Sequence, residues 1–437
     1  MLVVISDLHF QDTHNDNITD AEGNIVGIDR NVSPRAFEET FTEILSLAES
    51  NYAQELIIVL AGDIFDLNRS QTWFRGDNDR MRPYGEDAPE TWGPIAEKII
   101  TDICASNEET FALFKGQTEV TLKNGERVRF DYIPGNHDRI INLYEPLRGR
   151  VKDLFGLGGG NVPLKHEIPA EEYGVHIRHG HEYDPFNFAG KLPEQGPFAF
   201  NEDDYDLAPL GDYVTIDFAS RLAWTYRSRY ERNIKAGPDA DLHRHIYRKL
   251  LEFDDLRPQS EIVSFLQTET ADEDKVKQTL SPVLKDGLQK ALESRFVRDK
   301  LGLFRISMAK IAKAISTELL FDLLMSNQSR GPKPWEWAGR EAVLQGPQSK
   351  YRYVVSGHTH NADVEFLSRR PDGKEVFFFD TGTWRQQIRK CRDNRTFARA
   401  KVLTYVAFYR PDEDPPRTGK KEYSFDYWNG FTKKEIV

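Results

Sequence analysis

Side chains that can hold metal ions or transfer protons follow five apolar runs of the sequence. The runs are typical of buried strands, for example LVVIS at 2–6 and ELIIVLA at 55–61. The polar residues that follow them are Asp7 and His9; Asp63 and Asp66; Asn136, His137 and Asp138; His179 and His181; and His358 and His360. Ligands of α/β sheets gather outside the carboxyl ends of the strands, so we expect these clusters to meet at one edge of a sheet.

Carboxylates and imidazoles crowded at one edge lose contact with water, and this loss must be offset by partners of opposite charge. A pair of divalent cations would supply such partners. This mixture of ligands suits Mn, Fe, Zn or Ni. The two cysteines, Cys104 and Cys391, lie far apart and give no thiolate site for a structural zinc. Any one cluster would equally fit a polar loop or a surface histidine. Five clusters in series favour a site for two divalent ions, and we expect Mn²⁺ before the others.

The elements that must position these residues begin with strands and helices in alternation. Periodicity predicts helices at 33–50 and 92–106, with a polar loop at 68–91 before the second helix. Further strands are predicted at 118–135, as a hairpin around Asn124 and Gly125, and at 174–181, 351–358, 375–382 and 401–410. The pattern predicts an α/β fold in which helices cover layers of sheet.

A large helical insertion interrupts this α/β pattern. Residues 212–325 have helical periodicity with a polar break near 233–242, and the apolar stretch 306–325 predicts a buried helix. A connector rich in glycine and proline follows at 329–350. We therefore expect a core formed by residues 1–201 and 346–437, with residues 202–345 as an insertion. Its two ends join strands that carry site residues, so we expect a cap beside the site or a surface for homo-oligomer formation.

The overall composition limits the classes of protein that fit. The chain has 437 residues, 39% of them hydrophobic, and a net charge of −12, which argues against coating nucleic acid along its whole surface. Two distant cysteines give no disulfide framework and fit a reducing compartment. No apolar run approaches the roughly 20 residues of a membrane span. We expect a cytoplasmic protein without a membrane span.

One stretch departs from this acidic balance. Residues 385–401, RQQIRKCRDNRTFARAK, hold seven basic residues and one acid, and they follow a strand next to the one that ends in His358. The stretch fits a solvated basic loop, or a loop near the site that attracts polyanions. We expect the second case, with Arg385 and Arg389, and also Arg139, as candidates to contact a substrate such as DNA, RNA or a nucleotide.

The motifs together resemble those of a known superfamily. Asp7-Leu8-His9, Gly62-Asp63-x-x-Asp66, Gly135-Asn136-His137-Asp138, His179-Gly180-His181 and Gly357-His358-x-His360 are similar, in order, to the motifs of the calcineurin-like metallophosphoesterases. The resemblance covers roughly residues 1–200 and 351–410. It implies a sandwich of two mixed β-sheets flanked by helices. The HGH and GHTH motifs look most like the bacterial branch, whereas Leu67 stands where protein phosphatases have a phosphate-binding arginine.

The resemblance implies a role for each residue. Asp7, His9 and His360 would hold one metal ion, and Asn136, His179 and His358 the other, with Asp63 bridging the two. His137 would protonate the leaving group or bind a phosphoryl oxygen, with Asp138 holding its ring. Asp66 and His181 would support the ligands from behind or belong to plain loops.

The activity implied is metal-dependent hydrolysis of a phosphodiester or pyrophosphate bond, as in a phosphodiesterase or nuclease. We expect nucleic acid or a nucleotide as substrate. The alternatives are a pyrophosphatase acting on a UDP-sugar or lipid precursor, and a phosphomonoesterase. A different class, a catalytically silent scaffold that binds partner proteins, would be expected to lack some ligands, and all seven are present here.

Overall fold

The apolar runs of the sequence pair into two main β-sheets in the computed structural model, which describes residues 1–257, 265, 273–300, 333–393, 395–413 and 422–432. The larger, seven-stranded sheet is mixed. Its strands, in order, are β5 (Val128–Ile133), β4 (Leu56–Ala61), β1 (Leu2–Ile5), β13 (Phe397–Tyr409), β12 (Gln386–Lys390) and β8 (Leu256–Arg257), and β14 (Ser424–Thr432) also pairs with β13. Strands β1, β4 and β5 are parallel, so their carboxyl ends lie together.

The second sheet has five strands. In order they are β10 (Asp363–Arg369), β11 (Glu375–Asp380), β9 (Tyr353–Ser356), β7 (Val175–Arg178) and β6 (Glu167–Ala170). The three central strands are parallel and the two edge strands antiparallel. A separate pair, β2 (Ile18–Thr19) and β3 (Ile25–Val26), forms a small hairpin.

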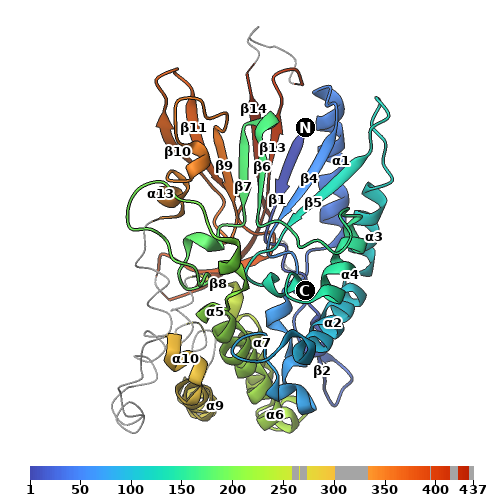
Figure 1. The fold of residues 1–437 in the computed structure, drawn as a ribbon. Coiled ribbons are helices and arrows are strands. Elements are labelled where there is room, and N and C mark those ends of the chain that lie inside the picture. The colour runs from blue at the N-terminus through green and yellow to red at the C-terminus, as the bar shows by residue number, and fades with distance from the viewer. Residues whose placement is uncertain (258–264, 266–272, 301–332, 394, 414–421, 433–437) are drawn as a thin grey trace.

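The two main sheets pack face to face because successive side chains of a strand point to opposite faces. In β1, Leu2 and Val4 enter a core shared with Val175 and Val355 of the second sheet. Val3 and Ile5 point the other way, into a core formed with helices. These helices are α1 (Pro34–Ser50), α2 (Pro89–Ser106), α3 (Glu108–Gln117) and α4 (Glu145–Phe155), and they cover the outer face of the larger sheet (Figure 1).

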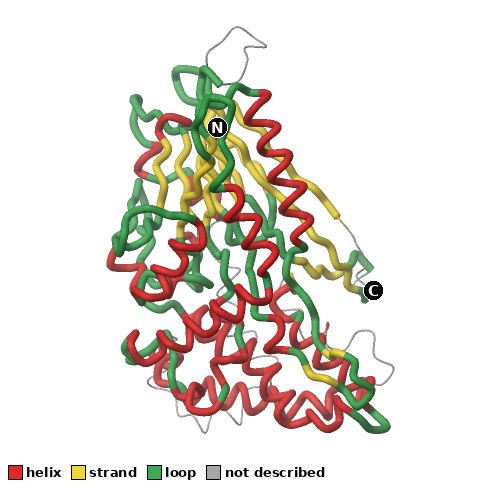
Figure 2. Tube along the Cα trace, turned by 90° about the vertical axis from the view of Figure 1, so that its right-hand side faces the viewer, coloured by secondary structure: helices red, strands yellow, loops and turns green. Residues whose placement is uncertain are grey.

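The helical part of the chain lies beyond the carboxyl ends of the parallel strands (Figures 1 and 2). We use the name helical segment for the described residues of 202–345. Its helices are α5 (Leu210–Tyr213), α6 (Arg221–Lys235), α7 (Ala240–Leu251), α9 (Glu273–Glu293), α10 (Arg295–Lys300) and α13 (Pro334–Ala338), with a π-helical stretch, Val214–Ser220, between α5 and α6. Helices α5, α6, α7, α9 and α10 share an apolar core with residues of β2, β3, β12 and β13, whereas α13 packs against the second sheet. The segment also contributes strand β8 to the larger sheet.

The structure is mixed α/β, as predicted, and it departs from the sequence expectation in several elements. Residues 118–135 form one β-bridge, Thr121 to Arg127, and then β5, which pairs with β4 rather than within a full hairpin. The expected loop at 68–91 contains short 3-10 turns, and α2 begins inside it. Helix α3 and strands β6, β8, β10, β12 and β14 were not predicted. The helix expected at 306–325 lies outside the described residues.

The basic stretch 385–401 is not a loop, which corrects the sequence expectation. Most of it forms β12 and the start of β13, which pair antiparallel. Arg385 is buried and pairs with Asp66 and Asp255, and Arg399 pairs with Glu252 at 2.7 Å. The acids that neutralise these cations come from distant parts of the chain, so the local count of charges could not reveal them.

Among the described residues, no helix combines the length and the apolar character needed to cross a bilayer.

Candidate metal centre

The backbone is strained at the residues singled out for chemistry. Six described non-glycine residues have a positive φ, and five of them are Asp7, His9, Asp63, His358 and His360, with φ between 49° and 71°. Such left-handed conformations are uncommon for non-glycine residues and concentrate at functional sites. The strained turns follow β1, β4 and β9, and they aim the side chains at a common point.

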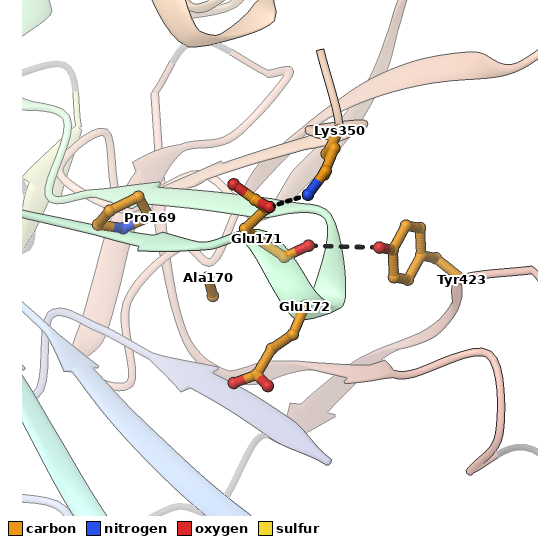
Figure 3. Close-up of a pocket in the computed structure, with 6 residues that line it drawn as sticks. All are labelled: Pro169, Ala170, Glu171, Glu172, Lys350 and Tyr423. Atoms are coloured by element: carbon orange, nitrogen blue, oxygen red, sulfur yellow. Dashed lines mark hydrogen bonds and ion pairs between the residues drawn. The ribbon is translucent and has the colours of Figure 1, made fainter. Parts of the chain in front are cut away.

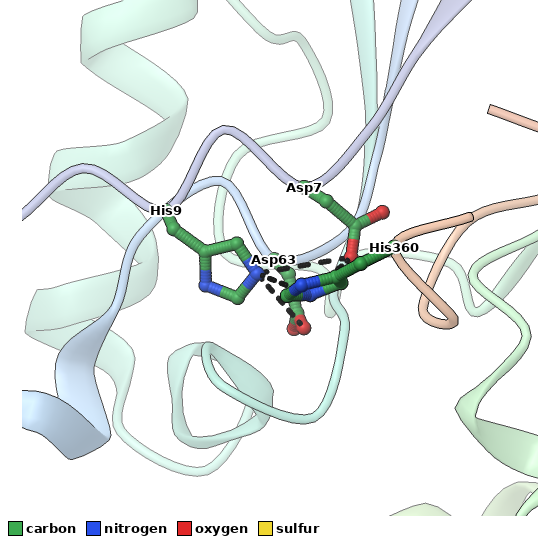
Figure 4. A group of neighbouring side chains, drawn as sticks. All are labelled: Asp7, His9, Asp63 and His360. Carbon is green, nitrogen blue, oxygen red and sulfur yellow. Dashed lines mark hydrogen bonds and ion pairs between the residues drawn. The ribbon is translucent and has the colours of Figure 1, made fainter. Parts of the chain in front are cut away.

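One group of potential ligands joins Asp7, His9, Asp63 and His360, whose donor atoms lie within 4.8 Å of one another (Figure 4). The Nε2 atoms of His9 and His360 are 3.0 Å apart, and Nε2 of His360 lies 3.4 Å from Asp7 Oδ1. All four residues are buried. Two imidazole nitrogens facing each other between carboxylates form a set of donors suited to a transition-metal ion.

A second group joins Asp63, His179 and His358, so Asp63 belongs to both groups. The Nδ1–H of His179 donates to the carbonyl of Ala61 at 2.8 Å, so Nε2, which lies 3.3 Å from Asp63 Oδ2, is the nitrogen open to a metal ion once the ring loses its second proton. A backbone acceptor of this kind commonly fixes the tautomer of a metal-binding histidine. The Oδ1 of Asn136 is also buried here, and no described residue gives it a hydrogen bond.

The pKa values of the residues in these two groups also fit the binding of a metal ion. Burial acts to raise the pKa of Asp7 and Asp63, but the facing imidazoles outweigh it and hold both pKa values well below the usual range. Burial acts to lower the pKa of His9 and His179, but the carboxylates around them raise these pKa values to about 9 and about 10. Ionised carboxylates and strongly basic imidazoles pointing inward are the ligands that a divalent cation requires.

The ring of His137 is held by Asp66 and not by Asp138, which corrects the sequence expectation. The Nδ1 of His137 lies 2.7 Å from Asp66 Oδ1. Asp66 Oδ2 also accepts from Gln11 at 2.6 Å and from Arg385 at 2.9 Å. Burial lowers the pKa of His137, but the charges of Asp66 and Asp63 raise it above its ordinary value. Asp66 is therefore the orienting carboxylate.

Asp138 holds the loops that carry the ligands. Its carboxylate accepts from the backbone N–H groups of Ile64 and Gly135 and from the hydroxyl of Tyr132. Burial and the nearby charge of Asp63 raise the pKa of Asp138 to about 6. The residue next to His137 in sequence thus points into the protein and contacts groups other than the His137 ring.

Two glycines permit the close approach of these loops. A Cβ at Gly135 would lie 2.2 Å from Asp63 Oδ1, and a Cβ at Gly357 would lie 2.1 Å from Asp7 Oδ2. Neither position has room for a side chain. The glycines of the GNHD and GHTH motifs are therefore required by packing around the carboxylates.

The remaining predicted residues lie at different places. His181 is buried behind the ligands, with its ring 5.3 Å from that of His179. Arg139 is buried and pairs with Asp212 of the helical segment at 2.7 Å, which assigns it to the junction with that segment rather than to a substrate. Arg389 is exposed on β12.

Sequence reasoning missed several residues that contact the site. Asp184 Oδ2 lies 3.2 Å from His358 Nε2, and Arg257 of β8 lies 2.7 Å from His360 Nδ1. The hydroxyl of Thr359 donates a hydrogen bond to the carboxylate of Asp380. Asp184 closely follows the HGH motif and could have been found as one more acid after a strand. Arg257 has no such signal, because a two-residue strand inside a helical region leaves no periodicity.

A separate surface pocket of about 490 Å³ is lined by Pro169, Ala170, Glu171, Glu172, Lys350 and Tyr423 (Figure 3). Lys350 is paired with Glu171, whose carbonyl also accepts from the Tyr423 hydroxyl at 3.3 Å. Glu171 precedes β7 and Lys350 precedes β9, whereas His179 and His358 follow these strands. The pocket lies at the other end of the strands and has no part in the site.

Comparison with known proteins adds no relative. No family model matches the chain, and no curated protein is similar to it in sequence.

Proposed function

We propose that the protein is a phosphoesterase of the calcineurin-like metallophosphoesterase superfamily, with two divalent metal ions held between its two sheets, and that it hydrolyses a phosphodiester or pyrophosphate bond. The observation that carries the proposal is the position of Asp63 in two of the three groups of potential ligands, the third being His9, Asp66 and His137. A shared carboxylate offsets the repulsion of two cations about 3.5–4 Å apart. Asn136 completes the second group with a neutral oxygen.

The two cations, when bound, would lower the pKa of a water molecule and stabilise negative charge on the phosphoryl oxygens. Asp7, His9 and His360 would hold one of them, and Asn136, His179 and His358 the other. Mn²⁺ is the first choice, and Fe, Zn and Ni also suit these ligands.

His137 is the proton donor in this proposal. Burial acts to lower its pKa, but the charges of Asp66 and Asp63 raise it and so favour the protonated ring, and the contact of Nδ1 with Asp66 leaves Nε2–H for the leaving group. After Nε2 gives up its proton, the neutral ring still donates from Nδ1 to Asp66. A proton transfer of this kind contributes roughly 10²–10⁴-fold to the rate.

The substrate class depends on the cations that lie near the site. The case for a nucleic-acid polymer rested on the basic stretch 385–401, and Arg385 and Arg399 of that stretch are paired with acids. A substrate with a small number of phosphates, such as a nucleotide, fits the remaining cations as well as a polymer does.

The proposal is tested by removing and restoring the metal. Protein stripped with EDTA should not hydrolyse bis(p-nitrophenyl) phosphate, and Mn²⁺ should restore turnover. A matched control is His14→Gln, because His14 is exposed and contacts Ser106 rather than the site. Turnover that survives the chelator would contradict the proposal, and metal binding without turnover of any phosphoester would favour the scaffold.

A further inference from the structure

Two arginines lie side by side on neighbouring strands next to the candidate metal centre. Strands β8 and β12 are parallel, and Arg257 is in register with Arg389. The residues before them, Leu256 and Ile388, are also in register and are buried in the core of the helical segment. Because successive side chains alternate, both guanidinium groups lie on the opposite face, toward His360.

Arg257 contacts a candidate metal ligand in a way that metal binding would disrupt. Its Nη2 lies 2.7 Å from His360 Nδ1, and a guanidinium can only donate hydrogen bonds. Nδ1 must then accept, which places the proton of a neutral His360 on Nε2. Nε2 is the atom that faces His9 and Asp7. A metal ion on Nε2 requires the proton on Nδ1, so Arg257 must turn away from His360 when the ion binds.

Arg389 is linked to the same histidine through neighbouring residues. Its guanidinium donates hydrogen bonds to the side chains of Gln387, at 3.0 Å, and Asn361. The side chain of Gln387 in turn donates to the backbone carbonyl of His360. Arg389 is exposed, and within the described part of the chain no carboxylate lies at ion-pair distance from it. Its charge therefore faces solvent beside the site.

We propose that Arg257 and Arg389 form a binding site for a second phosphate group of the substrate, next to the phosphate that reacts. The inference rests on the proposed function and deepens it by naming the substrate class. Guanidinium groups bind phosphate oxygens in pairs of parallel, charge-assisted hydrogen bonds, which a lysine cannot reproduce. The second phosphate belongs to a pyrophosphate or to the next nucleotide of a strand.

The test compares substrates that differ in their number of phosphates. Wild type, Arg257→Ala, Arg389→Ala and the conservative Arg257→Lys are assayed with bis(p-nitrophenyl) phosphate, with a dinucleoside pyrophosphate and with a short single-stranded oligonucleotide. Arg35→Ala is the matched control, because Arg35 is 74% exposed on α1 and pairs with Glu39. The ratio of kcat/KM for the two-phosphate substrate to that for the reporter should fall roughly 10- to 100-fold in each alanine variant, mainly through KM. Lysine should restore only part of the ratio.

Binding gives a readout that does not depend on turnover. Calorimetry on the manganese-loaded protein compares methylenediphosphonate with inorganic phosphate, and manganese content is measured afterwards. Wild type should prefer the diphosphonate, and the alanine variants should lose that preference while keeping their metal.

An equal loss for all substrates together with loss of manganese would overturn the inference and leave the arginines as supports of His360. A binding preference without turnover of any phosphoester would contradict the proposed reaction and keep the phosphate site. The better of the two substrates, pyrophosphate or oligonucleotide, identifies the source of the second phosphate.

Discussion

At the scale of single residues, the site depends on which carboxylate touches which imidazole. Asp66 lies in a different loop from His137 and holds its ring, whereas Asp138, its neighbour in sequence, holds the backbone of two loops. The motif alone could not separate these two roles, because they depend on side-chain direction. Asparagine variants of Asp66 and Asp138 can therefore be compared directly to separate the two roles.

Asp66→Asn should lower turnover by roughly 10²–10⁴-fold while leaving manganese content close to that of wild type, because the proton donor loses its partner. His137→Gln should have a similar effect. Asp138→Asn should instead lower the melting temperature, since each lost hydrogen bond to a charged group costs roughly 1.5–3 kcal/mol. Steady-state kinetics, metal analysis and thermal melts on the same preparations measure all three quantities. Normal turnover in Asp66→Asn together with slow turnover in a folded, metal-loaded Asp138→Asn would reverse the two assignments.

Metal binding should release protons near neutral pH. The carboxylates around His9 and His179 raise their pKa values to about 9 and about 10 in spite of burial, so both rings are protonated at pH 7 in the metal-free protein. Each must lose its proton to become a ligand. Calorimetry in buffers of different ionisation enthalpy should show the release of about two protons per chain. Release of none at pH 7 would show that these histidines are not ligands.

The same shifts predict how the stability of the metal-free protein depends on pH. Both pKa values lie above the ordinary value of 6.5, so protonation of these histidines contributes stability that is complete below about pH 6.5. The contribution is lost as the pH rises through about 9 to 10. The melting temperature of the stripped protein should fall over this interval, and a flat profile would contradict the shifts.

At the scale of elements, strands that end together bring distant residues to one point. The runs of apolar residues predicted β1, β4, β7 and β9, because buried parallel strands leave a strong signal. The polar clusters after them include the aspartates and histidines that the structure brings together. The register, the short strand β8 and the pairing of β12 with β13 could not be predicted. They depend on partners far away in sequence, such as the acids that neutralise Arg385 and Arg399.

The glycine before Asn136 gives a prediction for the packing of these strand ends. In Gly135→Ala the added methyl group would meet Asp63 Oδ1 at 2.2 Å, so Asp63 or the loop must shift. Crowding of this kind costs roughly 1–3 kcal/mol. We expect a lower melting temperature and weaker manganese binding. Gly116→Ala is the control, because a Cβ there meets no atom within 4 Å. Equal metal affinity in the two variants would contradict the packing account.

At the scale of the whole molecule, the helical segment is fixed to the core next to the site. Asp212 pairs with Arg139 at 2.7 Å, and Arg30 and Arg69 donate to the carbonyl of Leu251. Arg257 of the same segment reaches His360. A position beside the site was predicted from where the two ends of the insertion join the core. Its contacts could not be predicted, and formation of an oligomer through it stays a prediction.

Asp212→Asn should loosen this junction. The change leaves the Arg139 guanidinium buried without its counter-charge, and removal of one partner from a buried pair costs roughly 3–5 kcal/mol. Hydrogen exchange should rise in α5 and in the turn after Asp138. Asp241→Asn serves as the control, since the side chain of Asp241 is fully exposed. Unchanged exchange in Asp212→Asn would show that the pair does not hold the segment.

The central claim is that Asp63 lies between two metal ions, and anomalous scattering tests it most directly. Crystals grown with Mn²⁺ should show two anomalous peaks on either side of the Asp63 carboxylate, about 3.5–4 Å apart. One peak should lie among Asp7, His9 and His360, and the other among Asn136, His179 and His358. A single peak, or two peaks that do not share Asp63, would contradict the account.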